Sequence, residues 1–201
     1  MDLDLILNSF PKAVISIDTF RGKVAKEAIE AGAAMINDIS AFELDKEMIN
    51  TLSTYKVPYV LMHMQGKPQN MQDNPCYKNV VKDIIQFLDN KIRKLKTFGI
   101  HDIVIDPGFG FGKNKKHNLN LLNYFPLFHS LGYPICAGLS RKSLIDNIYK
   151  DKFKSNISPN QRLSGSLSLQ NIAFLNGAQI IRTHDIFEVQ QSFACLEEVY
   201  I

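Results

Sequence analysis

The stretch 102–113, DIVIDPGFGFGK, joins a short apolar run to an aspartate and then places three glycines within five residues. A β-branched run bounded by Pro and Gly is typical of a buried strand, so we expect a strand over 102–105 with Asp106 at its carboxyl end. The glycines do not match a phosphate-binding loop, because only three residues separate Gly108 from Gly112 and Asn114 follows the lysine. The dinucleotide fingerprint G-x-G-x-x-G fails as well. They instead predict a sharp turn that begins at the strand end.

Working outward from this stretch, five more short apolar runs predict strands, and apolar residues at 3.6-residue spacing predict helices between them. The expected strands are 13–17, 34–36, 59–62, 134–137 and 179–181. The clearest helical patterns run over 24–29, 81–95, 159–175 and 186–196, with Gly32, Gly99 and Gly177 as stop signals. Strands alternating with helices predict βα units around a parallel sheet, and runs that are apolar nearly throughout predict strands covered on both faces.

Polar residues follow every expected strand. Asp18, Asn37, Asp38, His63, Gln65 and Asp106 follow the first four, and Ser140, Arg141, Lys142, Arg182 and His184 follow the last two. A doubly wound open sheet would concentrate such residues at one switch point, whereas a barrel uses nearly every strand end. The fold class predicted is therefore α/β, a TIM (β/α)₈ barrel, here incomplete with about six βα units, and we treat 1–201 as one barrel domain.

The bulk composition sets limits on the function. The chain has 201 residues, 45% of them hydrophobic and 21% charged, as expected of one globular domain. A net charge of +3 without a Lys/Arg block argues against nucleic acid. The sequence contains no run of about 18 apolar residues that would indicate a membrane helix. Three cysteines without metal-like spacing predict reduced thiols and a cytoplasmic location.

The polar residues expected at the strand ends form two chemical sets. Asp18, Asn37, Asp106 and Lys142 offer acceptors and donors that suit the edge of a flat, nitrogen-rich heterocycle. Arg141, Arg182 and His184 can neutralise an anion, and arginine can bind phosphate or carboxylate oxygens through two N–H groups. The residues alone therefore predict a heterocycle next to an anionic group on one barrel rim.

Plainer interpretations remain open for single residues. Asp18 could be the N-cap of the next helix, and Asn37 and Asp38 could be turn residues. Phe111 could pack beneath its own loop. We interpret His63 as structural and expect His101 and His117 at the surface.

Seven motifs, taken in their order along the chain, resemble the dihydropteroate synthase family. They are SIDT at 16–19, NDIS at 37–40, LMHMQGKPQNMQ at 61–72, DPGFGFGK at 106–113, GLSRKS at 138–143, RLSGSL at 162–167 and RTHD at 182–185. The resemblance covers nearly the whole chain from about Pro11. It implies a transferase that joins p-aminobenzoate to 6-hydroxymethyl-7,8-dihydropterin pyrophosphate and releases pyrophosphate.

The resemblance also implies a role for each site residue. Asp18, Asn37, Asp106 and Lys142 would hold the pterin, with Asp18 and Lys142 as catalytic groups. Arg182 and His184 would hold the pyrophosphate. Phe111, Ser140 and Arg141 would lie near the p-aminobenzoate. Mg²⁺ would accompany the diphosphate, and the family also suggests a homodimer.

Compared with the family, this sequence lacks two βα units before SIDT, including an asparagine that helps to bind the metal, so we expect no protein metal ligand within this chain. A complete barrel takes about 250 residues, and six strands cannot close an eight-stranded barrel. We therefore expect 1–10 to be the end of the preceding helix, strands at both ends of the series to be open edges, and the chain alone to be poorly soluble or inactive.

Two other functions are weighed against synthesis of dihydropteroate. One is a non-catalytic paralogue that binds pterin. The other is a methyltetrahydrofolate-binding methyltransferase, which would share the pterin carboxylates but does not need SRKS or R-x-H-D. Calorimetric titration with pterin pyrophosphate, together with a product assay, separates binding from catalysis.

Overall fold

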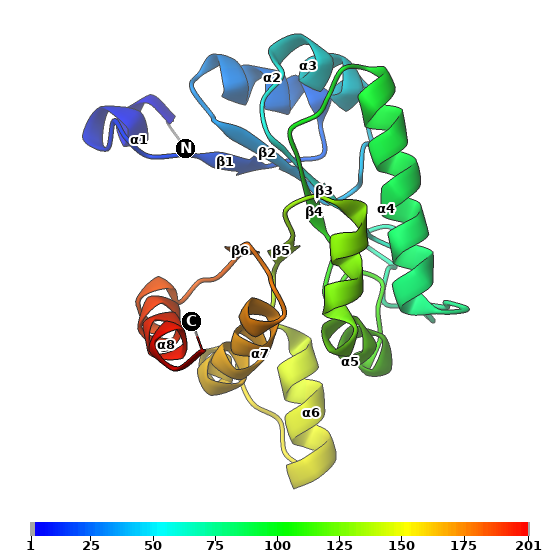
Figure 1. The fold of residues 1–201 in the computed structure, drawn as a ribbon, viewed down its shortest axis with the longest axis vertical. Coiled ribbons are helices and arrows are strands. Elements are labelled where there is room, and N and C mark those ends of the chain that lie inside the picture. The colour runs from blue at the N-terminus through cyan, green and yellow to red at the C-terminus, as the bar shows by residue number, and fades with distance from the viewer. Residues whose placement is uncertain (1–2, 201) are drawn as a thin grey trace. The chain divides into compact units, whose positions relative to one another are not determined.

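The computed structural model describes residues 3–200, and Met1 and Asp2 of the expected first helix lie outside them. All six predicted strands are confirmed (Figure 1). They are β1 Ser16–Asp18, β2 Met35–Asp38, β3 Tyr59–Met62, β4 Ile103–Asp106, β5 Cys136–Ala137 and β6 Ile180–Ile181. The helices are α1 Leu3–Ser9, α2 Gly22–Glu30, α3 Glu47–Tyr55, α4 Val80–Thr97, α5 Lys115–Asn123, α6 Ser143–Phe153, α7 Leu163–Leu175 and α8 Ile186–Tyr200, with 3₁₀ turns η1 Phe125–Leu131 and η2 Pro159–Arg162.

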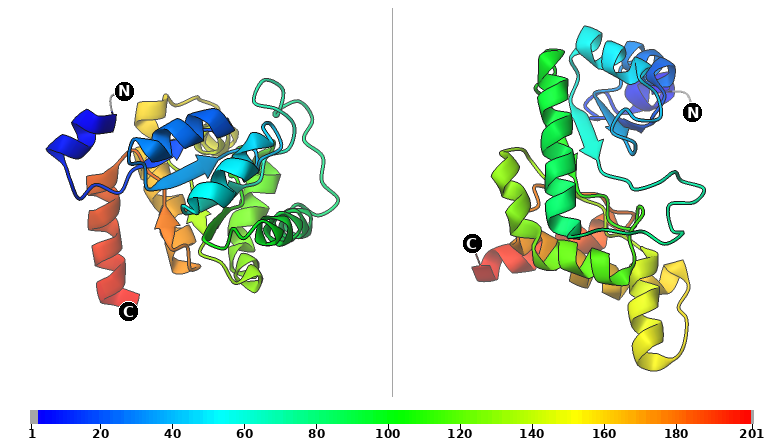
Figure 2. Two further views of the ribbon diagram at one scale, coloured as in Figure 1. Left: turned by 90° about the horizontal axis from the view of Figure 1, so that it is seen from above. Right: turned by 90° about the vertical axis from the view of Figure 1, so that its right-hand side faces the viewer.

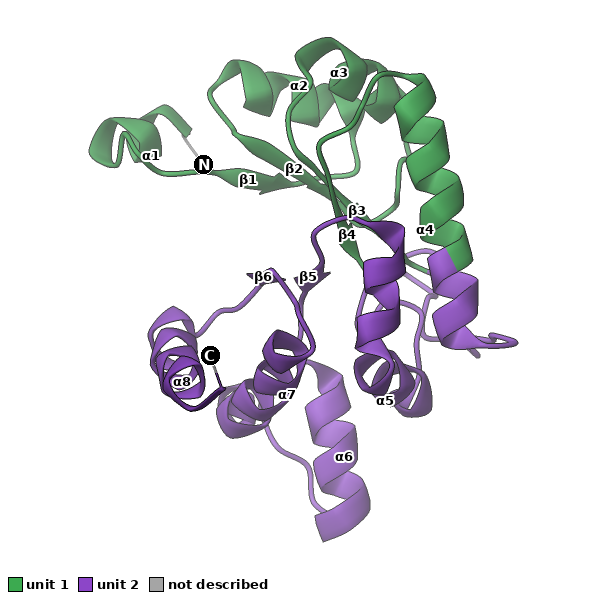
Figure 3. Ribbon diagram, viewed as in Figure 1, with its two compact units in different colours: residues 1–64, 86–106 green, residues 65–85, 107–201 purple. Residues whose placement is uncertain are grey.

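The chain divides into two compact units, which are described separately (Figure 3). The first comprises residues 1–64 and 86–106, and the second comprises 65–85 and 107–201. Helix α4 contributes to both, and its buried stripe follows the predicted 3.6-residue spacing at Val81, Ile84, Leu88, Ile92 and Leu95. The length of this helix can be followed in Figure 2.

The first unit is built on a parallel sheet with strand order β1-β2-β3-β4. Strands β3 and β4 bury their side chains on both faces, because Tyr59–Met62 and Ile103–Asp106 are buried at every position. Helices α2 and α3 lie side by side, and a Cβ at Gly22 would lie 2.6 Å from the backbone of Glu47 and Met48. A side chain at Gly22 would therefore force these two helices apart.

The second unit contains the parallel pair β5 and β6, in which Cys136 lies beside Ile180 and Ala137 beside Ile181. Its core contains the ring of Phe125, which lies 6.2 Å from both Phe109 and Phe128 between ring centroids. Helices α7 and α8 pack through the stacked rings of Phe174 and Phe193, whose centroids are 4.3 Å apart. The predicted proline start near Pro159 is the 3₁₀ turn η2, and α7 continues directly from it.

Two expectations about the strands are corrected. Strand β1 is not covered on both faces, because Ser16 and Asp18 are exposed. The apolar residues 13–15 that suggested a longer strand lie before its paired segment. Among residues 3–200, the strands form a four-stranded and a two-stranded sheet rather than one series of six. The parallel α/β fold is thus confirmed, and a single barrel rim remains a prediction.

A membrane-crossing helix would need both length and continuous apolarity, and no helix within residues 3–200 combines the two.

Candidate functional site

Three predicted pterin residues share one edge of the sheet in the first unit. Asp18 ends β1, Asn37 lies in β2 and Asp106 ends β4. Because these strands are parallel, their carboxyl ends meet at the same edge, and the register places Asp18 beside Asn37. Asp106 pairs with Met62 of β3, the strand between β2 and β4. The sheet therefore presents two carboxylates and one amide on a common edge.

The side chains of Asp18 and Asn37 contact each other directly. Asn37 Nδ2 donates to Asp18 Oδ1 at 2.6 Å. This bond fixes the amide orientation, so that Asn37 Oδ1 is the remaining acceptor of the amide. The N-cap interpretation of Asp18 is wrong, because the N-cap residue of α2 is Arg21 and the N–H of Gly22, the first residue of α2, donates to Asp45 Oδ2 at 2.8 Å.

Asn37 and Asp38 both lie in β2, so the turn-residue interpretation is wrong, although the Asp38 side chain holds the turn that follows the strand. Its fully buried carboxylate accepts hydrogen bonds from the Ser40 N–H and hydroxyl, the Phe42 N–H and the Tyr59 hydroxyl. Burial, together with the charge and hydrogen bond of Asp38, raises the pKa of Tyr59 well above its usual range. Tyr59 therefore remains a neutral donor to Asp38.

Arg182 and His184, two of the three residues predicted to neutralise an anion, line a cavity in the second unit. Its volume is about 340 Å³, within the usual range for small-molecule sites, and its lining is Gly138, Ser140, Lys142, Arg182, Thr183 and His184. Three of these six residues carry basic side chains and none is acidic. The composition of the wall therefore favours an anionic ligand.

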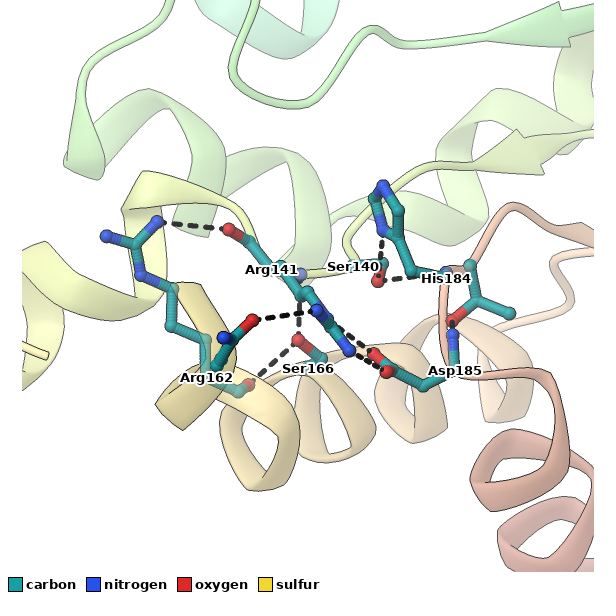
Figure 4. Close-up of polar contacts among 8 residues, drawn as sticks. Ser140, Arg141, Arg162, Ser166, His184 and Asp185 are labelled. Carbon is teal, nitrogen blue, oxygen red and sulfur yellow. Dashed lines mark hydrogen bonds and ion pairs between the residues drawn. The ribbon is translucent and has the colours of Figure 1, made fainter. Parts of the chain in front are cut away.

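Ser140 and His184 contact each other at this cavity (Figure 4). Ser140 Oγ lies 2.9 Å from His184 Nδ1 and accepts the backbone N–H of His184 at 3.2 Å. These contacts join the end of β5 to the end of β6. They leave Nε2 as the nitrogen of His184 that can face a ligand.

The Arg141 side chain, by contrast, does not line the cavity. Its Nε donates to Asp185 Oδ2 at 3.1 Å, its Nη2 donates to Asp185 Oδ1, and its Nη1 donates to Asn160 at 3.2 Å. The hydrogen bond and charge of Arg141 hold the pKa of Asp185 below its usual value. Asp185 is nearly buried, so a neutral side chain there would lose a charge-assisted pair that water does not fully replace.

We expect Asp185→Asn to lower the stability of the protein and to flatten its acid dependence. Since the folded-state pKa of Asp185 is lowered, its contribution is present above the unfolded value of about 3.9 and is lost as pH falls through the lower folded value. Urea unfolding between about pH 7 and pH 2 measures this. Asp151→Asn, which removes an exposed pair with Lys115, is the control. An equal effect of both variants would contradict the prediction.

The glycine-rich loop confirms the predicted sharp turn and excludes a phosphate cradle built from its lysine. Gly108, Gly110 and Gly112 all have positive φ, at 72°, 87° and 63°. The ammonium of Lys113 is buried and donates to the carbonyls of Gly108 and Phe111 at 2.8 and 2.9 Å. Lys113 thus holds its own loop in shape, a role that the sequence analysis missed.

Asn118 of α5 braces the same loop from the other side. Its Oδ1 accepts the Gly110 N–H at 2.7 Å, and its Nδ2 donates to the carbonyls of Lys113 and Asn114. Tyr77 donates to the Gly112 carbonyl at 2.8 Å. These bonds leave little freedom to a loop whose glycines would otherwise be mobile.

The braced loop presents Phe111 to Lys142. The Lys142 ammonium lies 4.4 Å from the centroid of the Phe111 ring, within the range of a cation–π contact. A Cβ placed on Gly110 would lie 3.6 Å from the same nitrogen. The loop therefore passes close to Lys142, and Phe111 is half-exposed rather than packed beneath it.

The structure brings the predicted residues together in two sets. One is Asp18, Asn37 and Asp106 in the first unit, and the other is Phe111, Ser140, Lys142, Arg182 and His184 in the second. Convergence of both sets on a single ligand remains a prediction. His63 is buried against Phe87 as expected of a structural residue, and His101 is exposed. His117 is half-buried and belongs to the capping box of α5.

Comparison with known proteins identifies the family. The profile of the family described as "Pterin binding enzyme" matches residues 3–184. The dihydropteroate synthase of Escherichia coli strain K12 is 37% identical over 185 residues, which are 91% of this chain and 63% of that protein. The chain thus spans less than two thirds of this curated relative.

Solved structures give the same result. The dihydropteroate synthase of Xanthomonas albilineans, in complex with 7,8-dihydropteroate, has a TM-score of 0.88 and 33% identity, covering 98% of this chain and 70% of that one. The enzyme of Thermus thermophilus, in complex with 4-aminobenzoate, has a TM-score of 0.90 and 32% identity, covering 99% and 78%. The profile match over most of the chain, together with these structures, shows that this protein belongs to the family of pterin binding enzymes.

Proposed function

We propose that this chain provides the pterin, diphosphate and p-aminobenzoate sites of a dihydropteroate synthase. The reaction would join 6-hydroxymethyl-7,8-dihydropterin pyrophosphate to p-aminobenzoate. The observation that supports this best is that one member of this family contains both an acceptor-rich sheet edge in its first unit and a cation-lined cavity of about 340 Å³ in its second. The relatives named as dihydropteroate synthases favour this activity over other uses of pterin.

The pterin would be held by Asp18, Asn37, Asp106 and Lys142. Asp106 is 6% exposed and Asn37 is 8% exposed, so bonds that they make to ring N–H and amino groups would be shielded from water. Lys142 would donate to the ring carbonyl. The hydrogen bond from Asn37 holds the Asp18 carboxylate, which would face positive charge on the ring.

The diphosphate would bind to Arg182 and His184 in the cavity. Phe111 and Ser140 would lie near the p-aminobenzoate, with Arg141 in the loop between Ser140 and Lys142. Phe111 offers an aromatic face next to a cation, and Ser140 is fixed by His184. A planar aromatic acid needs both a ring contact and polar groups at its ends, which this set supplies.

The reaction would proceed by departure of the diphosphate before attack. The bond between the pterin methylene carbon and the diphosphate oxygen breaks, and its electron pair leaves with the diphosphate. The amino nitrogen of p-aminobenzoate then forms a bond to the methylene carbon and releases a proton. Asp18 would stabilise the positive pterin, and Arg182 and His184 the negative leaving group, so the fixed charges would act where charge develops.

Mg²⁺ does not fit the cavity as a resident ion. Its lining contains no carboxylate, and residues 3–200 contain no group of three or more His, Cys, Asp or Glu side chains placed to hold a metal. Mg²⁺ binds oxygen ligands and commonly rides on substrate phosphates. We therefore assign the ion to the diphosphate substrate and route no step through a protein-held metal.

We also propose that the protein acts as one barrel domain and as a cytoplasmic homodimer. Exposed apolar side chains of α6, α7 and α8 support the dimer, since Phe153 is 64%, Leu175 48% and Phe187 73% exposed. Light scattering at micromolar protein measures it. A purely monomeric protein would contradict this part of the proposal.

We expect Lys142→Ala to weaken binding of the pterin pyrophosphate by about thirtyfold, since hydrogen bonds to charged groups contribute about 2 kcal/mol. In a full-length version of the protein, product formation should fall by about a hundredfold. Calorimetric titration and a coupled pyrophosphate assay measure the two. Lys150→Ala, an exposed lysine of α6, is the control.

The two measurements also separate the candidate functions. Tight binding of pterin pyrophosphate without product favours the non-catalytic paralogue, and binding of methyltetrahydrofolate in its place favours the methyltransferase. Unchanged binding in Lys142→Ala would remove the basis for the assigned site.

A further inference from the structure

The segment 162–166, RLSGS, has no role in the sites assigned above, although it is among the motifs that identify the family. It spans the end of η2 and the first turn of α7. Its Arg162 and Ser166 contact the backbone of Arg141 from opposite ends of the residue (Figure 4). The segment therefore has a structural link to the loop 140–142 that reaches the cavity.

Arg141 adopts a backbone conformation that a bulky side chain rarely takes. Its φ is 53°, in the left-handed region. Such a residue persists only where its surroundings hold it there, and these residues gather at functional sites. The conformation turns the chain between Ser140 and Lys142, both of which line the cavity, while the Arg141 side chain does not.

Hydrogen bonds hold both the backbone and the side chain of Arg141. Ser166 Oγ accepts the Arg141 N–H at 2.8 Å, and Arg162 Nη1 donates to the Arg141 carbonyl at 3.1 Å. The guanidinium is held by Asp185 and Asn160. Because the side chain is engaged away from the cavity lining, Arg141 acts as an anchor of the loop.

The groups that hold Arg141 are themselves fixed. Ser166 is fully buried, and its hydroxyl donates to the Arg162 carbonyl at 2.8 Å. Arg162 also donates to the Ile157 carbonyl at 3.3 Å and lies 3.7 Å from Asp146 Oδ2. A Cβ at Gly165 would lie 2.4 Å from the Ile145 side chain, so glycine allows α7 to approach α6 closely.

We propose that Ser166 and Arg162 are positioning residues of the synthase site. By holding Arg141 in the left-handed conformation, they fix Ser140 against His184 and keep Lys142 at the cavity. This inference rests on the proposed function, because it assigns the cavity to the diphosphate. It gives the RLSGS segment a role without contact to any substrate.

Helix α7 offers a matched pair of variants for the test. Ser166 and Ser168 both donate to the carbonyl four residues earlier, at 2.8 and 2.9 Å. Only Ser166 also accepts from Arg141, and Ser168 is exposed. Ser166→Ala and Ser168→Ala therefore lose the same helical bond and differ in the contact with Arg141. Ser166→Cys, which keeps the size but is a weak acceptor, serves as a milder second variant.

Two readouts are taken on the full chain. Amide exchange of Arg141, followed by NMR, should accelerate by more than about a hundredfold in Ser166→Ala because the N–H loses its acceptor. Calorimetric titration with inorganic pyrophosphate should show affinity weakened by about tenfold, in line with a displaced loop. Ser168→Ala should leave both unchanged, and Ser166→Cys should lie between the two.

The outcomes separate the inference from the function on which it rests. Faster exchange of the Arg141 amide with unchanged pyrophosphate affinity would overturn the positioning role, as would weaker affinity with unchanged exchange. Equal losses of pyrophosphate affinity in Ser166→Ala and Ser168→Ala would also overturn it, because the effect would then come from a weakened helix and not from the contact with Arg141. Failure of the unsubstituted protein to bind pyrophosphate would overturn the proposed function, and the exchange comparison, which needs no ligand, would still report whether Ser166 holds the loop.

Discussion

Replacing Asp38 by alanine is expected to lower the free energy of unfolding by about 5 kcal/mol, because four buried donor groups lose their acceptor and each such loss costs about 1–3 kcal/mol. The Asp38 carboxylate is fully buried and accepts four hydrogen bonds, of 2.7 to 2.8 Å, from the N–H and hydroxyl of Ser40, the N–H of Phe42 and the hydroxyl of Tyr59. Tyr59 is itself fully buried, so water does not reach its hydroxyl to replace the lost bond.

The turn that Asp38 holds also carries backbone strain. Ala41 and Phe42 have φ values of 51° and 55°, two consecutive non-glycine residues in the left-handed region. Asp38 holds this turn through its bonds to Ser40 and Phe42. Without the carboxylate, the turn should relax and release the strand end at which Asn37 contacts Asp18. Pterin binding should therefore weaken together with stability.

Urea unfolding followed by far-ultraviolet circular dichroism measures the effect of Asp38→Ala. Asp45→Ala is the matched control, because Asp45 also accepts two backbone N–H groups, at 2.8 and 2.9 Å, but is only half-buried. Its removal should cost about 1 kcal/mol, as for a helix cap. If Asp38→Ala also cost only about 1 kcal/mol, water would be replacing the carboxylate as the acceptor.

Tyr59 provides an independent readout of the same network. Because its folded-state pKa is raised well above the usual value of about 10, folded stability should decline as pH rises past that point, where the unfolded chain loses the proton first. Tyr59→Phe should reduce this alkaline decline, to which Tyr77, whose pKa is raised by burial, also contributes. Persistence of the same decline in Tyr59→Phe would assign it to other groups.

The sequence was sufficient to predict the strands whose burial is uniform. Residues 59–62 form β3 with the predicted bounds, because every side chain is buried and the flanking residues break the pattern. The prediction over 13–17 was less accurate, since only Ser16–Asp18 pair with β2. An apolar pattern reports burial but does not report which backbone groups find partners. For the same reason, it did not predict two separate sheets.

The candidate site was predictable as a set of residue types but not as a set of pairs. Asp18, Asn37 and Asp106 were expected at strand ends because parallel strands place their carboxyl ends together. The partnership of Arg141 with Asp185, 44 residues away, leaves no local signal in the sequence. Without that partnership, the sequence favours a ligand contact for Arg141, whereas its donors are engaged by Asp185 and Asn160. Buried Lys113 was likewise hidden, because charge patterns usually report solvated faces.

The glycine loop yields the second large prediction. Gly112→Ala should lower the free energy of unfolding by about 4 kcal/mol, of which about 1 kcal/mol comes from the left-handed backbone and the rest from overpacking. A Cβ at this position would lie 2.3 Å from the carbonyl oxygen of Gln65, a backbone atom that cannot rotate away. The loop would have to move, and with it the bond from Tyr77 to the Gly112 carbonyl.

Gly132→Ala separates the two contributions in the same unit of the protein. Gly132 has φ of 74°, close to the 63° of Gly112, but a Cβ there meets no atom within 4 Å. Gly132→Ala should lower the free energy of unfolding by only about 1 kcal/mol, the cost of the left-handed backbone. The loop that contains Gly112 also carries Phe111, which contacts Lys142. Gly112→Ala should therefore also weaken p-aminobenzoate binding, whereas Gly132→Ala should not. Equal unfolding free energies for the two variants would contradict the prediction. They would show that the loop adjusts to the added methyl group, so that the close approach to Gln65 contributes nothing to the loss of stability.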